Sequence, residues 1–274
     1  MEQLKIGICG VSGRMGRTLV RYVLGRDDVV LSGATEKPDH PWIGQTVKDC
    51  IKDSDCPIPV VDDPGQAFRR VDAIIDFTSP AATVSISEVA STLGIVHVVG
   101  TTGLTDEHLD VLAGAAGHAV IVRAGNMSLG VNLLVELTEK IGAALDADFD
   151  VEILESHHRH KVDSPSGTAL MLGRAAERGR GAANPKSPPH FHVGNTGPRK
   201  RGAIGYSAVR GGDVVGEHDV IFAADGERVI LRHIATDRAI YARGAIAAAI
   251  WGQNKPFGEY DMADVLGLKA TSQP

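Results

Sequence analysis

Scarcity of cysteine and of aromatic residues is the first feature that limits what this 274-residue chain can be. Aromatic residues make up 4% of the chain and hydrophobic residues 43%, so the expected core is aliphatic and rich in alanine. Of the three cysteines, Cys9 lies within the first predicted strand, while Cys50 and Cys56 are close enough in sequence to pair. Free thiols in a reducing compartment are nevertheless expected, and a disulfide framework is not.

The sequence also lacks a membrane span, a signal segment and an excess of positive charge. No apolar run is long enough to cross a bilayer, and residues 1–5 contain no apolar signal core. The net charge of −6 argues against a general nucleic-acid-binding protein. We therefore expect a soluble cytoplasmic protein that binds neither nucleic acid nor a membrane.

A glycine-rich turn near the start of the chain gives the first positive indication of function. A short apolar strand, Lys5–Cys9, leads into Gly10-Val-Ser-Gly-Arg-Met-Gly16, and a helical pattern follows. A second strand, Val29–Ala34, ends close to Glu36. Tight turns use glycine for other reasons as well, but a strand, a glycine turn, a helix and then an acid are typical of a dinucleotide site.

The next part of the chain alternates between strands and helices, which predicts a parallel sheet covered on both faces. Ligands of such sheets bind beyond the carboxyl ends of the strands. Three strand ends there are polar or rich in glycine, and together they favour a rim that lines a cofactor. The expected strands are Asp72–Phe77, Val96–Val99 and Val120–Val122, the helices are Ala81–Leu93 and Asp106–Ala115, and the strand ends are Phe77-Thr78, Gly100-Thr101-Thr102 and Gly125-Asn126.

The pattern changes after a long helix that is expected from Ser128 to about Leu145. Strands then follow one another without intervening helices, which indicates an antiparallel or mixed sheet and a second domain of α+β type. The expected elements are strands Ile204–Arg210, Val214–Ala223 and Arg228–Ile234, a hairpin turn at Ala224-Asp225-Gly226, a loop over Asn184–Pro198, and helices at Arg238–Trp251 and Met262–Leu266. The predicted fold class is α/β, a Rossmann-type doubly wound parallel sheet with a second α+β domain.

The densest chemistry lies between a predicted strand, Phe149–Leu154, and a helical pattern that starts near Leu170. His157-His-Arg-His-Lys161 offers five consecutive residues that carry charge or exchange protons, and a Ser-Pro-Ser-Gly-Thr turn follows at 164–168. Hydroxyl residues and proline suit a helix start, whose free amides attract anions. This combination is typical of a site for a small carboxylate substrate with acid–base groups beside it.

Two plainer interpretations of this cluster remain open on the residues alone. A run of charged residues is most often solvated loop surface. Metal binding is the other alternative, because five histidines are available, but their spacing matches no familiar zinc pattern, and the cysteines are distant. Those histidines are His157, His158, His160, His190 and His192. We expect no metal site.

The stretch Glu155-Ser-His-His-Arg-His-Lys-Val-Asp-Ser-Pro-Ser-Gly-Thr168 resembles the signature of the dihydrodipicolinate reductase (4-hydroxy-tetrahydrodipicolinate reductase) family nearly throughout. Further motifs that fit this family are Gly10–Gly16, Asp76–Thr78, Gly100–Gly103, Asn126–Asn132 and Val215–His218. The resemblance implies reduction of 4-hydroxy-tetrahydrodipicolinate to tetrahydrodipicolinate by NADH or NADPH, in lysine and diaminopimelate biosynthesis. It also implies a homotetramer.

The resemblance assigns roles residue by residue. It implies that His157 is the catalytic acid–base group, that Lys161 is the second proton donor, and that His158, Ser166, Gly167 and Thr168 bind the dicarboxylate substrate. The implied cofactor residues are Gly10, Val11, Ser12, Gly13, Arg14, Met15, Glu36, Lys37, Gly100, Thr101, Thr102, Ala124, Gly125, Asn126 and Met127. Gly125 stands where many relatives carry alanine or proline, which loosens that rim without removing it. Lys37 stands where some relatives carry arginine. Glu36 favours the ribose hydroxyls of NADH and Lys37 offers the opposite charge to a 2′-phosphate, so both NADH and NADPH are expected to serve.

The implied domains are a dinucleotide-binding domain formed by residues 1–127 and 238–274, and a domain for substrate binding and oligomerisation formed by residues 128–237. Two other functions are compatible with parts of the sequence. Another Rossmann dehydrogenase of amino-acid metabolism remains open, although no cysteine nucleophile stands at a strand end. A nucleotide-sensing regulator would need a basic helix-turn-helix, which the sequence does not contain, and it leaves His157 and Lys161 unexplained.

Overall fold

The computed structural model describes residues 3–52, 54–181 and 189–269. The contacts within the chain divide it into two compact units. Unit 1 comprises Met1–Ser128 and Ala239–Pro274, and unit 2 comprises Leu129–Arg238. Within the described residues, no helix is long and apolar enough to span a membrane. All three cysteines are free thiols in this part of the chain.

Unit 1 is built on a seven-stranded sheet in the order β12-β6-β5-β4-β1-β2-β3, and every pair of neighbouring strands is parallel. All residues of β4 and β5 are buried, so both faces of the sheet centre are covered, as expected for strands that read as continuous apolar runs. The strands are β1 (Leu4–Cys9), β2 (Val29–Thr35), β3 (Val60–Val61), β4 (Ala73–Asp76), β5 (Val96–Val99), β6 (Val120–Arg123) and β12 (Gly258–Tyr260).

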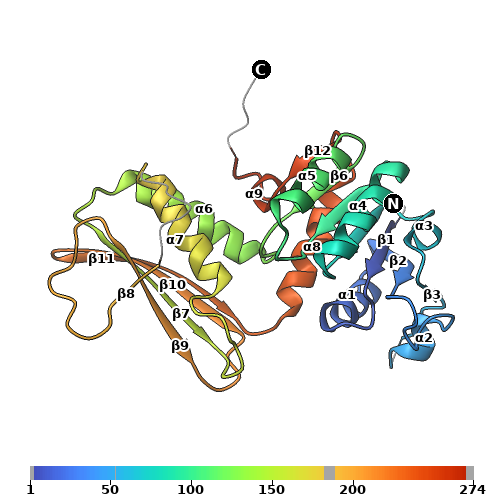
Figure 1. Ribbon diagram of the computed structural model, residues 1–274, viewed down its shortest axis with the longest axis horizontal. Coiled ribbons are helices and arrows are strands. Elements are labelled where there is room, and N and C mark those ends of the chain that lie inside the picture. The colour runs from blue at the N-terminus through green and yellow to red at the C-terminus, as the bar shows by residue number, and fades with distance from the viewer. Residues whose placement is uncertain (1–2, 53, 182–188, 270–274) are drawn as a thin grey trace. The chain divides into compact units, whose positions relative to one another are not determined.

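Helices alternate with these strands along the chain, as Figure 1 shows. Helix α8 contacts α1 as well as β4, β5 and β6, whereas α4 contacts α5. The apolar positions of α4 and α5, such as Ile86 and Leu112, share one core cluster with Ile74 and Val99 of the sheet. The helices are α1 (Arg14–Leu24), α2 (Val47–Cys50), α3 (Pro64–Ala67), α4 (Pro80–Leu93), α5 (Asp106–Ala115), α8 (Ala239–Gly252) and α9 (Met262–Val265).

Several short elements of unit 1 were not expected from the sequence. These are α2, β3, α3 and β12, each only two to four residues long. Elements of this length are too short to show a helical or strand period. Local capping still marks two of them, because the Thr46 and Asp63 side chains accept hydrogen bonds from amides in the first turns of α2 and α3.

Unit 2 contains a mixed five-stranded sheet in the order β11-β10-β7-β9-β8, which confirms the predicted α+β character. Strand β10 is antiparallel to β7 and β11, whereas β7, β9 and β8 run parallel. The strands are β7 (Asp150–His157), β8 (His190–Phe191), β9 (Ile204–Arg210), β10 (Gly216–Ala224) and β11 (Glu227–Ala235), and the helices are α6 (Leu129–Ala144) and α7 (Gly167–Gly179). Both helices pack on the sheet through a shared apolar core.

The structure corrects three predicted boundaries in unit 2. Strand β7 continues to His157 instead of ending at Leu154, because its alternation of buried and half-buried residues continues through Glu155 and His157. Strand β10 starts at Gly216, two residues later than expected. The expected loop Asn184–Pro198 contains the short strand β8, and its residues 184–188 lie outside the described residues.

Candidate active site

The glycine turn of unit 1 joins β1 to α1 and depends on the absence of side chains. Gly10 has a φ of +64°, a region that favours glycine. A Cβ on Gly16 would lie 2.2 Å from the carbonyl oxygen of Gly10 and 2.7 Å from the Cα of Val11. The first turn of α1 therefore packs directly on the backbone of the turn. The early amides of a helix have no acceptor within it, so they are available to an anionic ligand.

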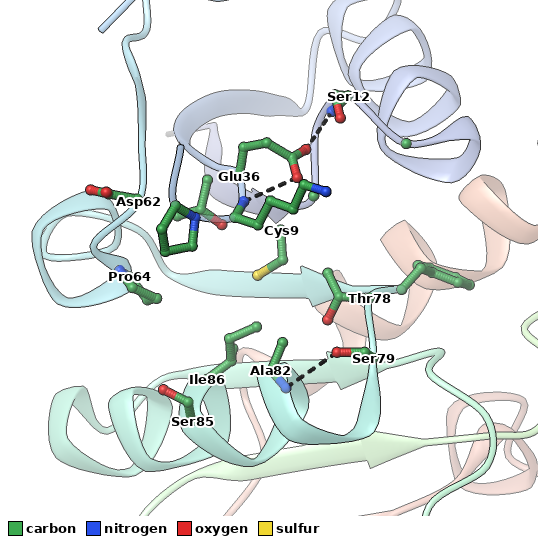
Figure 2. A pocket seen from close by; sticks show the side chains of 16 residues that line it. Cys9, Ser12, Glu36, Asp62, Pro64, Thr78, Ser79, Ala82, Ser85 and Ile86 are labelled. Atoms are coloured by element: carbon green, nitrogen blue, oxygen red, sulfur yellow. Dashed lines mark hydrogen bonds between the residues drawn. The ribbon is translucent and has the colours of Figure 1, made fainter. Parts of the chain in front are cut away.

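A pocket of about 480 Å³ opens beside this turn, and Figure 2 shows the side chains that line it. Five of the predicted cofactor residues are part of its wall: Gly10, Ser12, Gly13, Glu36 and Lys37. The other lining residues are Cys9, Thr35, Pro38, Asp62, Pro64, Phe77, Thr78, Ser79, Ala82, Ser85 and Ile86. The sequence marked Phe77 and Thr78 as a strand end, but the contributions of Asp62, Pro64 and Ser85 had no local signal.

Glu36 is held in place by two backbone amides at the edge of this pocket. Ser12 N donates to Glu36 Oε2 and Lys37 N donates to Glu36 Oε1, each at 3.0 Å. Burial by itself would raise the pKa of Glu36, but these hydrogen bonds lower it below its ordinary value. The carboxylate is thus an anion that connects the segment after β1 with the segment after β2. Its oxygens can still accept further hydrogen bonds from ligand hydroxyls.

A buried polar network lies below the pocket, at the carboxyl ends of β4 and β5. Asp76 is fully buried and accepts hydrogen bonds from Thr78 N at 2.8 Å and from the Thr83 hydroxyl at 2.6 Å. Thr101 Oγ1 accepts from Thr78 N at 3.1 Å, which connects the two strand ends. Burial opposes ionisation of Asp76, yet its pKa lies below the ordinary value because of nearby His97 and these threonines.

The remaining predicted cofactor residues have different environments. The side chains of Val11, Ala124 and Met127 are buried, so only their backbone could face a ligand. Gly100 packs on the ring of Phe77, since a Cβ there would lie 2.3 Å from that ring. The structure places Arg14 and Met15 at the start of α1, Thr102 and Gly125 at exposed positions, and Asn126 where its Oδ1 accepts from Ser128 N.

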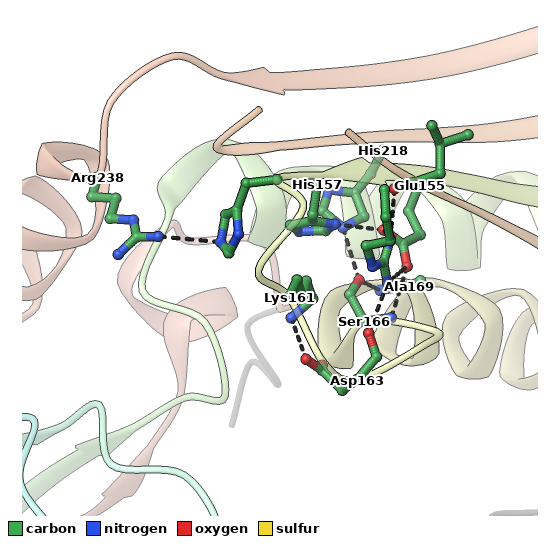
Figure 3. Close-up of polar contacts among 11 residues, drawn as sticks. Glu155, His157, Lys161, Asp163, Ser166, Ala169, His218 and Arg238 are labelled. Carbon is green, nitrogen blue, oxygen red and sulfur yellow. Dashed lines mark hydrogen bonds and ion pairs between the residues drawn. The ribbon is translucent and has the colours of Figure 1, made fainter. Parts of the chain in front are cut away.

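The polar cluster of unit 2 begins at the end of β7, where Glu155 and His157 share the buried face of the strand. His157 Nδ1 lies 2.5 Å from Glu155 Oε2. Arg210, paired with His157 in the register of β7 and β9, donates through Nη2 to Glu155 Oε1 at 2.6 Å and through Nη1 to Glu155 Oε2 at 2.8 Å. Figure 3 shows Glu155 and His157 side by side, with Ser166 and His218 next to them. Neither Glu155 nor Arg210 was predicted as a site residue.

His218 extends the cluster across to β10. Its Nε2 lies 3.1 Å from Ser166 Oγ, and its ring meets the ring of His157 edge-on, with the centroids 5.1 Å apart. Burial, followed by the charge of His157, lowers the pKa of His218 to about 4. His218 is therefore neutral near pH 7. His218 lies within one of the motifs that resemble the family, Val215–His218, but no role was predicted for it.

Ser166 connects this cluster to the start of α7. Its side chain accepts a hydrogen bond from Ala169 N at 3.1 Å as the N-cap, and its own amide donates to Glu155 Oε1 at 3.1 Å. Gly167 and Thr168 form the first helical turn. A Cβ on Gly167 would have no described atom within 4 Å other than its chain neighbours and helix backbone, so that turn faces open space.

The loop between β7 and α7 carries the other predicted side chains. Lys161 Nζ forms an ion pair with Asp163 Oδ1 at 2.8 Å. His158 Nε2 lies 3.4 Å from Arg238 Nη2, and burial together with that guanidinium lowers the pKa of His158. His157, His158, Lys161 and Ser166 thus all lie between the end of β7 and the start of α7, whereas the side chain of His160 in the same loop is exposed.

The histidines considered for a metal site have other contacts. His192 Nε2 lies 2.9 Å from Glu152 Oε1, and the ring of His190 lies edge-on to that of His192. In residues 3–52, 54–181 and 189–269, no three His, Cys, Asp or Glu side chains converge as a metal-binding group.

A parallel α/β sheet with a glycine turn before α1 and a carboxylate after β2, together with a second unit that holds a buried histidine cluster, is typical of nucleotide-dependent dehydrogenases and reductases. Two family models match the chain. The model for the N-terminus of dihydrodipicolinate reductase matches residues 4–127, and the model for its C-terminus matches residues 130–266. The chain belongs to the dihydrodipicolinate reductase family, which confirms the resemblance drawn from the sequence motifs.

Individual relatives agree with this assignment. The chain is 59% identical to the 4-hydroxy-tetrahydrodipicolinate reductase of Dinoroseobacter shibae over 263 residues, which cover 96% of this chain and 98% of the relative. It is 58% identical to the enzyme of that name from Ruegeria pomeroyi, with the same coverage. The fold is similar to that of the dipicolinate-bound dihydrodipicolinate reductase from Paenisporosarcina sp. TG-14, with a TM-score of 0.75, 22% identity, and coverage of 96% of this chain and 99% of that chain.

Proposed function

We propose that this chain reduces 4-hydroxy-tetrahydrodipicolinate to tetrahydrodipicolinate with NADH or NADPH, as a cytoplasmic enzyme of lysine and diaminopimelate biosynthesis. The activity is that of the family to which the chain belongs. The single observation that carries the assignment of residues is the pairing of His157 with buried Glu155, beside the exposed first turn of α7. Besides a hydride, this reduction needs an acid–base group and a site for a carboxylate, and these residues offer both.

The residues of unit 1 fit a dinucleotide. The turn at Gly10–Gly16 has no room for side chains where α1 meets it, so its backbone and the helix start can approach a pyrophosphate. Glu36 offers carboxylate oxygens to ribose hydroxyls at the end of β2. When bound, the nicotinamide supplies the hydride. We assign residues 1–127 and 238–274 to this domain.

Residues of unit 2 would bind the substrate and supply the proton. The early amides of α7 at Gly167 and Thr168 suit one carboxylate of a dicarboxylate. His158 and Lys161 add hydrogen-bond donors and positive charge for the rest of the molecule. His157 provides the proton to the atom next to the carbon that receives the hydride, and Lys161 is the second proton donor. Dipicolinate, the ligand bound by the similar structure, is a dicarboxylate of this type.

We further propose that residues 128–237 mediate assembly into a homotetramer. The face of the sheet opposite α6 and α7 carries exposed apolar side chains, including Val209, Ile230 and Ile234, each more than half exposed. Exposed apolar side chains gathered on one sheet face favour a protein interface. Sedimentation of the purified chain tests this. A particle of four copies supports it, and a monomer at micromolar concentration contradicts it.

The activity is tested by following NADH and NADPH oxidation with the freshly formed condensation product of pyruvate and aspartate semialdehyde. Oxidation that depends on this substrate, and that pyridine-2,6-dicarboxylate inhibits competitively, supports the proposal. Absence of turnover with either cofactor, in a chain that is folded by circular dichroism, would rule it out.

A further inference from the structure

Glu155 is a carboxylate in a position that would otherwise suit an apolar residue. It lies on the inner face of β7 after Val151 and Ile153, and only 1% of it is exposed to solvent. Burying a charge in this way is costly unless the charge is fully paired, and a hydrophobic side chain would often be as stable. The location of Glu155 therefore needs an explanation beyond packing of the sheet.

Four hydrogen bonds converge on the two oxygens of Glu155. Oε1 accepts from Arg210 Nη2 at 2.6 Å and from Ser166 N at 3.1 Å, and Oε2 contacts Arg210 Nη1 at 2.8 Å and His157 Nδ1 at 2.5 Å. Burial opposes ionisation, but the bonds from His157 and Arg210 lower the pKa of Glu155 to about 2. Glu155 is thus an anion throughout the neutral range, and its contacts leave it little freedom to move.

An anionic carboxylate can only accept hydrogen bonds, so the short contact requires a proton on Nδ1 of His157. The other ring nitrogen, Nε2, is then the one available to a ligand. Gly216 lies next to it, since a Cβ on that residue would be 3.1 Å from Nε2. The absence of a side chain at 216 keeps space open beside the reactive nitrogen.

The charged and titratable groups around the His157 ring come from four strands and one loop. Glu155 lies on the same strand, Arg210 on β9 faces Glu155, and neutral His218 on β10 packs edge-on against the ring. His233 on β11 faces His218. The β7–α7 loop adds His158, Lys161 and Asp163. Glu155 is the negative group in direct contact with the ring, and Arg210 directs its guanidinium at Glu155 instead of at His157.

We propose that Glu155 is a positioning residue for the reduction: held by Arg210, it keeps a proton on Nδ1 of His157 and stabilises the imidazolium, so that Nε2 delivers a proton to the substrate. The proposal rests on the proposed function. The 4-hydroxyl group of the substrate first leaves as water, together with a hydrogen from the adjacent carbon, and the hydride then adds to the conjugated imine that results. In the proton step, the Nε2–H bond breaks and a bond from that hydrogen to the substrate forms, at the atom next to the carbon that takes the hydride. The neutral ring retains its Nδ1 proton, and solvent returns the proton to Nε2.

Glu155→Gln is the main test, because it removes the charge and keeps the shape. We expect kcat to fall roughly 10–100-fold, with KM for the substrate and Kd for NADH within about threefold of wild type. The limb of the kcat/KM profile on which activity declines as pH rises should move about one unit to lower pH, because the anion that favours imidazolium is gone. Glu155→Asp, which keeps the charge, should recover part of kcat and most of the pH profile.

Asp219→Asn provides the matched control. Asp219 is also a buried carboxylate in this sheet, with 6% of the residue exposed. It lies on β10 and accepts a bidentate pair of hydrogen bonds from Arg232 on β11. If Glu155 only stabilised the sheet, both variants should lower the melting temperature and neither should shift the pH profile. Such a result, or wild-type kcat and pH profile in Glu155→Gln, would overturn the proposal.

The tautomer of His157 can be measured without turnover. Long-range 15N–1H NMR spectra of 15N-histidine-labelled protein distinguish Nδ1–H from Nε2–H, and His157→Gln assigns the signal by difference. We expect Nδ1–H in wild type and a mixture of tautomers in Glu155→Gln. An Nε2–H ring in the wild type at a pH where it is neutral would overturn the inference even if the enzyme is active. An inactive wild type would instead contradict the proposed function. If Glu155→Gln fails to fold, Arg210→Lys allows both measurements with the carboxylate in place.

Discussion

The two units offer different kinds of atoms to their proposed ligands. In unit 1 the pocket depends on backbone: Gly10 at positive φ, Gly16 in contact with the turn, and amides that hold Glu36. In unit 2 the site depends on side chains from three neighbouring strands and one helix start. We therefore expect cofactor affinity in unit 1 to fall when the backbone of the turn is displaced. In unit 2 we expect turnover to fall when a side chain that carries a proton or a charge is removed.

The strand register shows why the second site is so compact. Glu155 pairs with His218 of β10 on one side and with Ala208 of β9 on the other, and His157 pairs with Arg210. Residues opposite one another in a sheet lie about 5 Å apart, so these pairings place an acid, an arginine and two histidines in contact. A shift of one residue in either pairing would turn them to opposite faces.

The largest effect should come from the proton-transfer groups of unit 2. His157→Ala and Lys161→Ala should each lower kcat by roughly 10²–10⁴-fold, the usual contribution of a positioned acid or base. NADH affinity should hardly change, because neither residue lines the pocket of unit 1. His160→Ala, an exposed histidine in the same loop, is the control and should retain turnover within about twofold. Wild-type turnover in His157→Ala or Lys161→Ala would remove that residue from the mechanism.

A displaced backbone should have the next largest effect. Gly16→Ala introduces a Cβ 2.2 Å from the carbonyl oxygen of Gly10, so α1 must move away from the turn. Overpacking of this kind costs about 1–3 kcal/mol of unfolding free energy, and NADH affinity should fall at least about tenfold. Gly114→Ala in α5 is the matched control. Its Cβ would meet no described atom beyond its own helix and neighbours, so it should gain about 0.5–1 kcal/mol. Unchanged stability and affinity in Gly16→Ala, measured by urea unfolding and fluorescence titration, would contradict the model of a backbone site.

The burial of His218 predicts how the stability of the protein depends on pH. Its pKa falls from an ordinary value of 6.5 to about 4, so the unfolded chain binds a proton first as the pH decreases. The stabilisation is therefore complete above about pH 6.5 and is lost towards pH 4, a change of roughly 1–3 kcal/mol. His218→Gln should flatten the unfolding free energy over this interval, measured by urea unfolding at constant ionic strength. An equally steep decline in the variant would show that other groups are responsible.

Cofactor preference should be the smallest of these effects. In the proposed cofactor site, Glu36 should favour the ribose hydroxyls of NADH and repel a 2′-phosphate, while the exposed Lys37 beside it should attract that phosphate. Each interaction is on the order of 4 kcal/mol before desolvation and side-chain entropy are subtracted, so they nearly balance. The kcat/KM values for NADH and NADPH should agree within about tenfold, or roughly 1.4 kcal/mol.

Lys37→Ala sharpens this prediction, because it should weaken NADPH and leave NADH nearly unchanged. Lys48→Ala, which removes a lysine of the same unit outside the pocket, should alter neither cofactor. High salt should reduce the difference between the cofactors, since Lys37 is exposed. A preference above about a hundredfold for either cofactor would show that the balance is wrong.

Much of the first site could be predicted from sequence because it is local. The turn, the helix start and Glu36 lie within one β-α-β segment, where spacing along the chain determines spacing in the fold. The rest of the pocket could not be predicted in this way. Asp62 and Ser85 reach it from separate elements, and the segment that carries β3 and α3 is too short to show a period. The hydrogen bonds that join Asp76, Thr83 and Thr101 could not be predicted from the sequence either, because the three residues lie at two strand ends and in a helix.

The sequence by itself determined the class of fold and the family, and it proposed the reactive side chains, because glycine spacing, apolar periodicity and the motif at 155–168 are local properties of the chain. Only the tertiary structure decided how those side chains are controlled. Glu155 looked like the polar end of a strand, and its partner Arg210 lies 55 residues away. The register of β7 with β9 and β10 buries that carboxylate, fixes its charge and directs it at Nδ1 of His157. A pairing between distant strands is a property of the packed sheet, and no short stretch of sequence contains it.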